Sequence, residues 1–193
     1  MRYILSLDPA QLRDWSALSA IQMQWNLDKK RHEYALVALN RKQQLPYDQI
    51  VDWVISTLQK PIFREQTTDY PELVLDATGV GVAINDMFRQ RGIRPRAVMI
   101  TSGNVKTKVG SIYHVGKAKL IGSFLSAYDS GKVQVNPNHP MWPQLEKEML
   151  AFRAEMSSQG HAKFEAGQGE HDDLLFSLAM GVWYGEDVLR GAK

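Results

Sequence analysis

One short segment constrains the fold of this chain more than any other. Residues 72–75 form a largely apolar stretch that leads to Asp76, and Ala-Thr-Gly79-Val-Gly81 then opens a segment whose apolar residues recur at helical spacing. This order predicts a buried strand, a tight turn and a helix, a combination typical of an α/β sheet. An acid at the carboxyl end of such a strand points into the crevice where α/β proteins bind their ligands.

Three interpretations of Asp76 remain open at this level. Gly79 and Gly81 partly match the dinucleotide fingerprint, but that fingerprint requires a third small residue where this chain has Ile84. A carboxylate just before the glycines would also repel a pyrophosphate, whereas it would attract a divalent cation. The third interpretation is that Asp76 only shapes the turn, as aspartate often does.

Length and composition limit the class of protein. The chain has 193 residues, of which 44% are hydrophobic, and these values predict one globular domain over residues 1–193. It contains no cysteine, so any bound metal must be held by oxygen or imidazole ligands. No apolar run is long enough to cross a bilayer or to form a signal peptide. A soluble cytoplasmic protein with no membrane partner is therefore expected.

The distribution of charge keeps nucleic acid among the candidate partners. The net charge of +2 is too small to establish a polyanionic partner, but basic residues recur near glycine-rich turns. Lys106 and Lys108 lie in a segment that could face DNA. Lys117 and Lys119 begin a predicted helix, where a cation opposes the helix dipole unless an anion is present. Lys117 is therefore a candidate phosphate contact, although a solvated helix start explains it equally well.

The chain in order predicts a mixed sheet flanked by helices. Three antiparallel strands come first, and strands joined by helices, which favour parallel pairing, follow them. The expected elements are strands 3–7, 15–25 and 33–41, a helix capped by Asp48 and ending near residue 58, strand 72–75, helix 80–91, strand 96–100, a loop over 101–116, helix 115–128, edge strand 132–135, helix 140–155, a candidate strand 161–165 and a final helix 174–184. Trp15, Trp25, Trp53, Trp142 and Trp183 fall mostly in apolar patterns, so core packing is favoured over base stacking for each.

Further acids occupy the ends of predicted elements. Asp8 ends the first strand before Pro9, and Asp172 with Asp173 opens the final, strongly apolar helix. Taken alone, the pair is explained by capping and by the helix dipole. The three sites can converge if the first strand lies beside the strand of Asp76.

The ordered set of motifs resembles the nuclease domain of the large terminase subunit of tailed bacteriophages, a member of the ribonuclease H-like, or RuvC-like, superfamily. The matching motifs are Leu-Asp8-Pro-Ala with Asp14-Trp-Ser-Ala, then Leu-Asp76-Ala-Thr-Gly-Val-Gly, then His171-Asp172-Asp173. The resemblance covers essentially the whole chain and implies an α/β fold with a ribonuclease H-like mixed sheet.

The resemblance also implies a set of site residues. The first and second metal ligands fall on Asp8 and Asp76, and the third falls on the pair Asp172 and Asp173, between which the sequence does not choose. Asp14 matches an acid of the family, although a role in the turn is the favoured explanation. His171 could orient a water molecule or bind metal weakly, but a structural role is more common for a lone histidine.

The implied activity is metal-dependent cleavage of double-stranded DNA, with low sequence specificity, during phage genome packaging in the cytoplasm of the infected bacterial host. The implied partners are the terminase ATPase domain, the small terminase subunit and the portal. The ATPase motif Gly-x-x-x-x-Gly-Lys-Ser/Thr does not occur here, so the chain is expected to be the nuclease half alone, with no nucleotide cofactor.

The chemistry of phosphodiester hydrolysis fits this inventory of residues. Two divalent ions about 4 Å apart can make the attacking water more acidic and neutralise the leaving oxygen. Clustered carboxylates without cysteine suit two Mg²⁺ or Mn²⁺ ions. Three alternatives remain: a junction resolvase or RNA/DNA-hybrid nuclease of the same superfamily, a non-catalytic nucleic-acid-binding module, and a dinucleotide-binding oxidoreductase.

Overall fold

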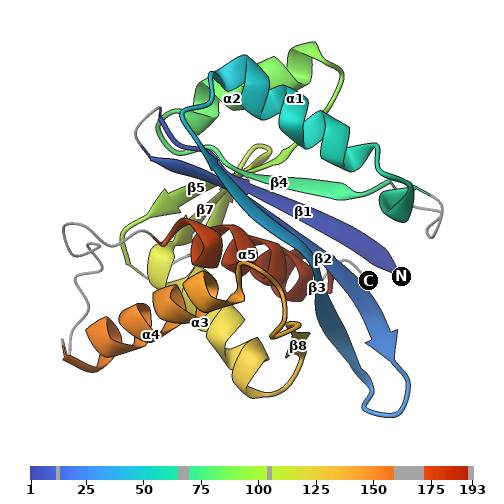
Figure 1. Cartoon of the computed structure of the whole chain (residues 1–193), viewed down its shortest axis with the longest axis vertical. Coiled ribbons are helices and arrows are strands. Elements are labelled where there is room, and N and C mark those ends of the chain that lie inside the picture. The colour runs from blue at the N-terminus through green and yellow to red at the C-terminus, as the bar shows by residue number, and fades with distance from the viewer. Residues whose placement is uncertain (12–13, 65–69, 104–105, 159–171, 191–193) are drawn as a thin grey trace.

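The strand that ends in Asp76 lies near the middle of an eight-stranded mixed sheet (Figure 1). The computed structural model describes residues 1–11, 14–64, 70–103, 106–158 and 172–190. In these residues the strands are β1 Arg2–Asp8, β2 Trp15–Asn26, β3 Arg31–Gln43, β4 Glu72–Asp76, β5 Arg96–Thr101, β6 Lys106–Val109, β7 Ile112–Gly116 and β8 Val133–Gln134. The helices are α1 Tyr47–Leu58, α2 Gly81–Gln90, α3 Lys117–Asp129, α4 Trp142–Ser158 and α5 Asp173–Tyr184, with a short 3₁₀ turn at Pro61–Phe63 and a π-helical extension at Gly185–Leu189.

The strand order is β6-β7-β5-β4-β1-β2-β3-β8. The first three strands pair antiparallel, as their sequence pattern predicts, and β1 then pairs parallel with β4. Strand β4 in turn pairs parallel with β5, and β5 with β7. The predicted α/β class, with a sheet of antiparallel and parallel strands flanked by helices, is confirmed.

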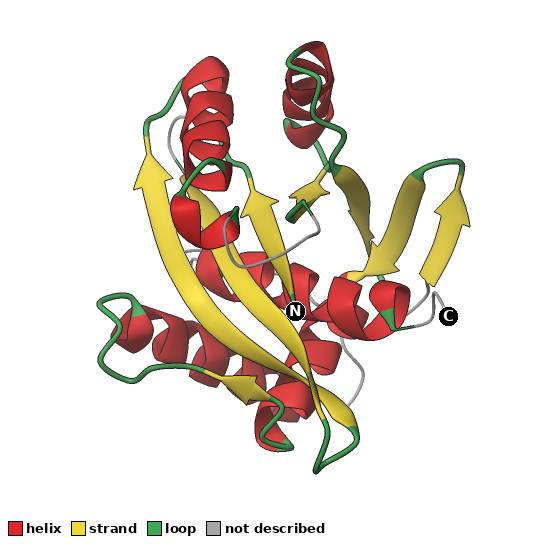
Figure 2. Cartoon of the chain, turned by 90° about the vertical axis from the view of Figure 1, so that its right-hand side faces the viewer, coloured by secondary structure: helices red, strands yellow, loops and turns green. Residues whose placement is uncertain are grey.

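Helices cover both faces of the sheet. Figure 1 shows α1 and α2 on one face and α3, α4 and α5 on the other, and the perpendicular view in Figure 2 shows the twisted strands between these two layers. Because side chains alternate along a strand, Leu5 and Leu7 of β1 join the core under α1 and α2, while Ile4 joins the core under α5. Each layer therefore has its own apolar core.

Helix α5 is held against the sheet at close range. A Cβ atom on Gly181 would lie 2.5 Å from Ser6 Oγ, so only glycine lets the helix approach β1 this closely. Ser177 Oγ also donates a hydrogen bond to the Ser6 carbonyl oxygen, 3.2 Å away. Leu174 and Leu178 are fully buried, and each contributes about 2 kcal/mol of hydrophobic stabilisation. The start of α5 is thereby fixed relative to β1.

Three expectations about local structure were wrong. Asp48 does not cap α1, because the helix begins at Tyr47 after Pro46 and Asp48 lies in its first turn, where an acid still favours the dipole. Much of the segment 101–116, expected to be a loop, forms the hairpin β6–β7. Its turn uses Gly110 at φ +60°, and β7 gains a second partner in β5.

The third error concerns Trp25, which was expected to lie in the core. Its side chain is 50% exposed, because β2 and β3 extend beyond the helices that cover the sheet. The candidate strand 161–165 lies outside the described residues. Within the described part of the chain, no helix combines the length and the apolar character that a membrane crossing requires.

Candidate metal centre

Asp8 and Asp76 are brought together by the parallel pairing of β1 with β4. Leu7 is in register with Leu75, so the acid that follows each leucine emerges at the same edge of the sheet. By strand alternation, both acids share the face of Ile4 and Val74, which belong to the core under α5. The strand of Asp8 thus lies beside the strand of Asp76, which is the arrangement that convergence of the acids requires.

The turn after Asp76 fixes the orientation of its carboxylate. The Thr78 backbone N–H donates to Asp76 Oδ1 at 2.8 Å, and Thr78 Oγ1 accepts a hydrogen bond from the Ile100 N–H at 2.9 Å. Gly79 adopts φ +54°, and a Cβ atom on Gly81 would lie 1.8 Å from the Asp76 carbonyl oxygen. The two glycines therefore allow α2 to begin directly against the end of β4.

Asp172 and Asp173 approach the same region from the start of α5. Asp172 occupies the N-cap position but its side chain makes no capping hydrogen bond. Its Oδ2 atom instead lies 2.7 Å from Lys117 Nζ, at the first residue of α3. Helix capping therefore does not explain the position of the Asp172 side chain, which pairs instead with Lys117 of the neighbouring helix α3.

The charges of the other three acids act on the pKa of Asp8. Burial is the largest cause that raises the pKa of Asp8 well above its usual value, and the charges of Asp76, Asp173 and Asp172 raise it further, in that order. Lys117 acts in the opposite direction. Burial also raises the pKa of Asp76, while its hydrogen bonds with Thr78 lower it.

The donor set suits a hard divalent cation. Carboxylate oxygens are the ligands that Mg²⁺ and Mn²⁺ prefer, and mutual repulsion of ionised carboxylates favours the uptake of positive charge. Among the described residues, no three acidic or histidine side chains already stand in the arrangement that holds a metal ion. The assignment of Asp8, Asp76, Asp172 and Asp173 as ligands stays a prediction.

Sequence reasoning missed Glu148 of α4, which lies next to this cluster. Its side chain is almost fully buried, and its Oε2 atom accepts a hydrogen bond from the Leu175 N–H, at 2.9 Å, in the first turn of α5. Arg41 Nη1 lies 3.6 Å from Glu148 Oε1. Burial raises the pKa of Glu148 to about 7, with a smaller contribution in the same direction from Asp173, and outweighs the effect of Arg41.

A signal for Glu148 was present in the sequence. The acid lies within the apolar stripe of its helix, three residues after Leu145 and four before Phe152, both of which are buried. A charge at such a position is unusual unless a specific partner satisfies it. The partner, the Leu175 N–H in the first turn of α5, could be identified only once the helices were placed in space.

The other predicted site residues have surroundings of their own or fall outside the described residues. Asp14 is exposed in the turn before β2, and His171 is not among the described residues. Lys106 and Lys119 lie 3.8 and 3.5 Å from Asp187 Oδ2, and Lys108 stacks on Tyr113. Asp187 is about 22 Å from Asp172 at the usual rise of a helix. Of the four lysines, Lys117 is the one that the structure pairs with the acidic cluster.

Comparison with known proteins defines the fold. No family model and no curated protein matches the sequence. Among solved structures, the large terminase nuclease of thermophilic phage G20c with bound magnesium has a TM-score of 0.61 and 23% identity, over 94% of this chain and 80% of the phage chain. This chain therefore shares its fold with that nuclease.

Two further solved structures share this fold. The large terminase of another thermophilic bacteriophage has a TM-score of 0.60 and 10% identity, and the match covers 94% of this chain and 39% of that one. The terminase nuclease domain of human cytomegalovirus, soaked with manganese, has a TM-score of 0.52 and 16% identity, over 97% and 83% of the two chains. The structural neighbours are thus nuclease domains of terminase large subunits, as the sequence motifs predict.

Proposed function

We propose that this protein is a metal-dependent endonuclease that hydrolyses phosphodiester bonds in double-stranded DNA. One observation carries the proposal. Asp8 and Asp76 end two parallel strands, and Asp76, Asp173 and Asp172 all lie close enough to Asp8 for their charges to raise its pKa. A cluster of carboxylates in which burial raises the pKa of two members, here Asp8 and Asp76, is the kind of site that binds divalent cations.

The proposed ligands are the carboxylates of Asp8 and Asp76 and one or both of Asp172 and Asp173. When bound, two Mg²⁺ or Mn²⁺ ions would make the attacking water more acidic and neutralise the charge that develops on the leaving oxygen. The hydrogen bond from the Thr78 N–H occupies one lone-pair direction of Asp76 Oδ1, and the carboxylate keeps further lone pairs for a metal ion.

Two neighbouring residues support these acids in the proposal. Lys117 balances part of their charge through Asp172, and its ammonium group is a candidate contact for a substrate phosphate. Glu148 accepts the Leu175 N–H and so holds the first turn of α5, and with it Asp173, at a fixed distance from α4. The substrate phosphate would bind where Lys117 and the metal ions offset the negative charge of the acids.

The proposed biological setting is supported by the fold and the motifs together. The similarity to terminase nucleases supports cleavage with low sequence specificity during genome packaging, in the cytoplasm of an infected bacterial host. In that setting the partners would be the terminase ATPase domain, the small terminase subunit and the portal, and the chain would act as a single nuclease domain.

Plasmid cleavage tests the proposal. Purified protein is incubated with supercoiled plasmid and Mn²⁺, Mg²⁺ or chelator, and Asp76→Asn is compared with Asp86→Asn, a matched change of an exposed acid on α2. We expect nicking and linearisation with metal only, lost in Asp76→Asn and retained in Asp86→Asn. No cleavage with either metal, or full cleavage by Asp76→Asn, would refute the proposal.

A substrate panel tests the choice of DNA duplex. Linear duplex, a four-way junction and an RNA/DNA hybrid are offered at equal concentration with the preferred metal. Preference for the duplex supports the proposal. A strong preference for the junction or the hybrid would instead make the protein a resolvase or a hybrid nuclease of the same fold.

A further inference from the structure

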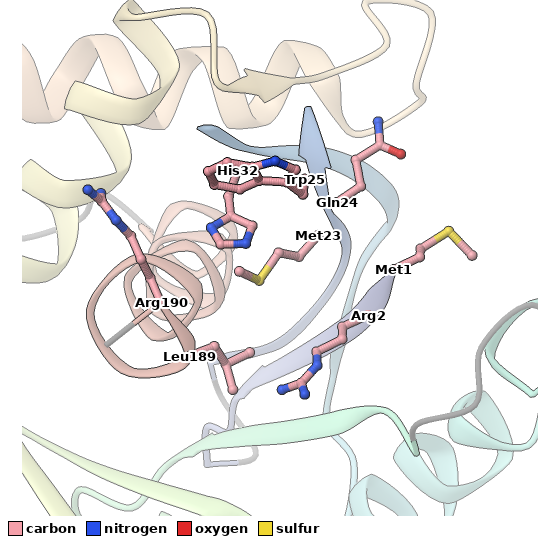
Figure 3. Close-up of a pocket in the computed structure, with 8 residues that line it drawn as sticks. All are labelled: Met1, Arg2, Met23, Gln24, Trp25, His32, Leu189 and Arg190. Carbon is pink, nitrogen blue, oxygen red and sulfur yellow. The ribbon is translucent and has the colours of Figure 1, made fainter. Parts of the chain in front are cut away.

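A pocket of about 300 Å³ lies at the end of the sheet opposite the acids. Figure 3 shows eight side chains around it, from the start of β1, the end of β2, the start of β3 and the end of the π-helical extension. The side chains are those of Met1, Arg2, Met23, Gln24, Trp25, His32, Leu189 and Arg190. Two guanidinium groups, an indole ring and an apolar floor thus face one space.

Trp25 presents an aromatic surface to solvent at this pocket. Its side chain is half exposed, and its ring meets that of His32 edge to face, with centroids 4.9 Å apart and an interplanar angle of 75°. The contact with His32 supports one side of the indole from the neighbouring strand. A large, positioned and accessible ring is a stacking platform for a planar ligand.

The charge around the pocket favours an anion. The Arg190 side chain is 60% exposed, and its Nη1 atom lies 3.2 Å from Glu186 Oε2. The Glu186 carboxylate also has two other partners: Lys132 Nζ lies 3.0 Å from Oε2, and the Tyr34 hydroxyl donates a hydrogen bond to Oε1. Arg190 therefore retains donors for a second partner, because a guanidinium carries five N–H groups. Arg2 adds a second guanidinium on the far side of the same space (Figure 3).

We propose that this pocket binds one nucleotide unit of a nucleic-acid strand. The base stacks on Trp25, and Arg190 and Arg2 bind the phosphate. Guanidinium groups suit phosphate because their planar fork matches two of its oxygens. A planar aromatic group joined to a phosphate combines the two features that the pocket complements. The choice of a nucleotide over other planar anions rests on the proposed nuclease function.

The pocket is separate from the acids. Arg2 and Asp8 lie at opposite ends of β1, about 20 Å apart at the usual rise of a strand. Nucleotide binding at the pocket is therefore expected without metal, and its loss should leave the metal site intact. The two sites can be tested independently.

Calorimetric titration with deoxyadenosine monophosphate, in chelator and at low salt, tests the pocket. We expect saturable binding that is about tenfold weaker in Trp25→Leu, because stacking on an aromatic ring accounts for an effect of this order. Arg190→Gln is expected to weaken binding similarly. Arg94→Gln, which removes an exposed arginine before β5, should bind as wild type does. Thermal unfolding confirms that each variant is folded.

Ligand fragments identify what the pocket recognises. Deoxyadenosine and inorganic phosphate should each bind at least tenfold more weakly than the nucleotide. Absence of saturable nucleotide binding, equal binding of inorganic phosphate, or unchanged binding by Trp25→Leu would overturn the proposal. Tighter binding of an acidic peptide than of any nucleotide would make the pocket a protein-docking site and would also overturn it. Nucleotide binding without plasmid cleavage would refute the nuclease function and leave this inference intact.

Discussion

Lys117 Nζ and Asp172 Oδ2 lie 2.7 Å apart. Lys117, the first residue of α3, is therefore the counter-ion of Asp172, which precedes α5. Both side chains are less than one-third exposed. Lys117 also lowers the pKa of Asp8, against the three carboxylates that raise it. The pair therefore balances part of the charge of the acidic cluster.

Replacement of Lys117 by Gln is expected to destabilise the metal-free protein at pH 7 by about 1–2 kcal/mol, the usual value of a partly buried, charge-assisted hydrogen bond. Addition of Mn²⁺ should restore most of this loss, because the cation takes over the balancing of charge. Lys119→Gln, two residues later and beside Asp187, is the control. Urea unfolding with chelator and with Mn²⁺ measures both effects, and equal behaviour of the two variants would contradict the role of Lys117.

Replacement of Asp8 by Asn is expected to raise the melting temperature of the metal-free protein near pH 7. The folded-state pKa of Asp8 is raised, so its contribution to stability is lost as the pH rises above the unfolded pKa of about 4. The same substitution should abolish the increase in melting temperature caused by Mn²⁺. Asp28→Asn, in the exposed turn between β2 and β3, should change neither quantity. A lower melting temperature of metal-free Asp8→Asn would argue against crowding of the acids.

Glu148 should make the stability of the metal-free protein depend on pH in a defined window. Its pKa is about 7 in the folded protein and ordinarily 4.5, so the folded state binds more protons and loses stability as the pH rises from 4.5 to 7. The loss is on the order of 3 kcal/mol across this window. Glu148→Gln keeps an oxygen for the Leu175 N–H and should remove this part of the slope. Urea unfolding between pH 4.5 and 8 measures the slope.

Glu146→Gln, an exposed change on the same helix, is the matched control for Glu148→Gln. Its unfolding free energy should follow that of wild type at every pH. Parallel curves for wild type and Glu148→Gln would show that Glu148 titrates normally, contrary to its burial.

Gly81→Ala is expected to destabilise the protein by about 3 kcal/mol, since the new Cβ atom would overlap the Asp76 carbonyl oxygen unless α2 moves away from β4. Gly79→Ala has open space around it and should cost only the strain of its positive φ, about 1 kcal/mol. Metal affinity should fall more in Gly81→Ala because Asp76 belongs to the displaced turn. If Gly79→Ala were the more harmful change, close packing would not be what positions Asp76.

Most of the sheet could be predicted from local patterns. Alternating residues in β2 and β3, and the strand, turn and helix around Asp76, depend on short-range periodicity that the sequence displays directly. The hairpin β6–β7 was missed because Lys106 and Lys108 make that segment polar, and Gly103, Gly110 and Gly116 make it rich in glycine. The pairing of β7 with β5 also depends on a strand that the local sequence does not reveal. Trp25 was misplaced because the alternation of a strand continues past the end of the core.

The candidate site could be predicted only in part. Asp8 and Asp76 were recognisable because each follows an apolar strand, and parallel pairing brings such ends together. Glu148 and the counter-ion role of Lys117 depend on how α3, α4 and α5 pack, with contacts that join residues 27 and 55 positions apart. Spacing in the sequence carries no information about contacts of this kind.

The most direct test of the central claim is a crystal structure of the protein soaked with Mn²⁺, with anomalous scattering used to locate the ions. We expect anomalous peaks at the carboxylates of Asp8 and Asp76, with at least one of Asp172 and Asp173 as a further ligand, at oxygen distances of about 2.1–2.2 Å. The Lys117 ammonium should then move away from Asp172. Ordered Mn²⁺ at other residues only, or no peak at these acids under saturating Mn²⁺, would contradict the account.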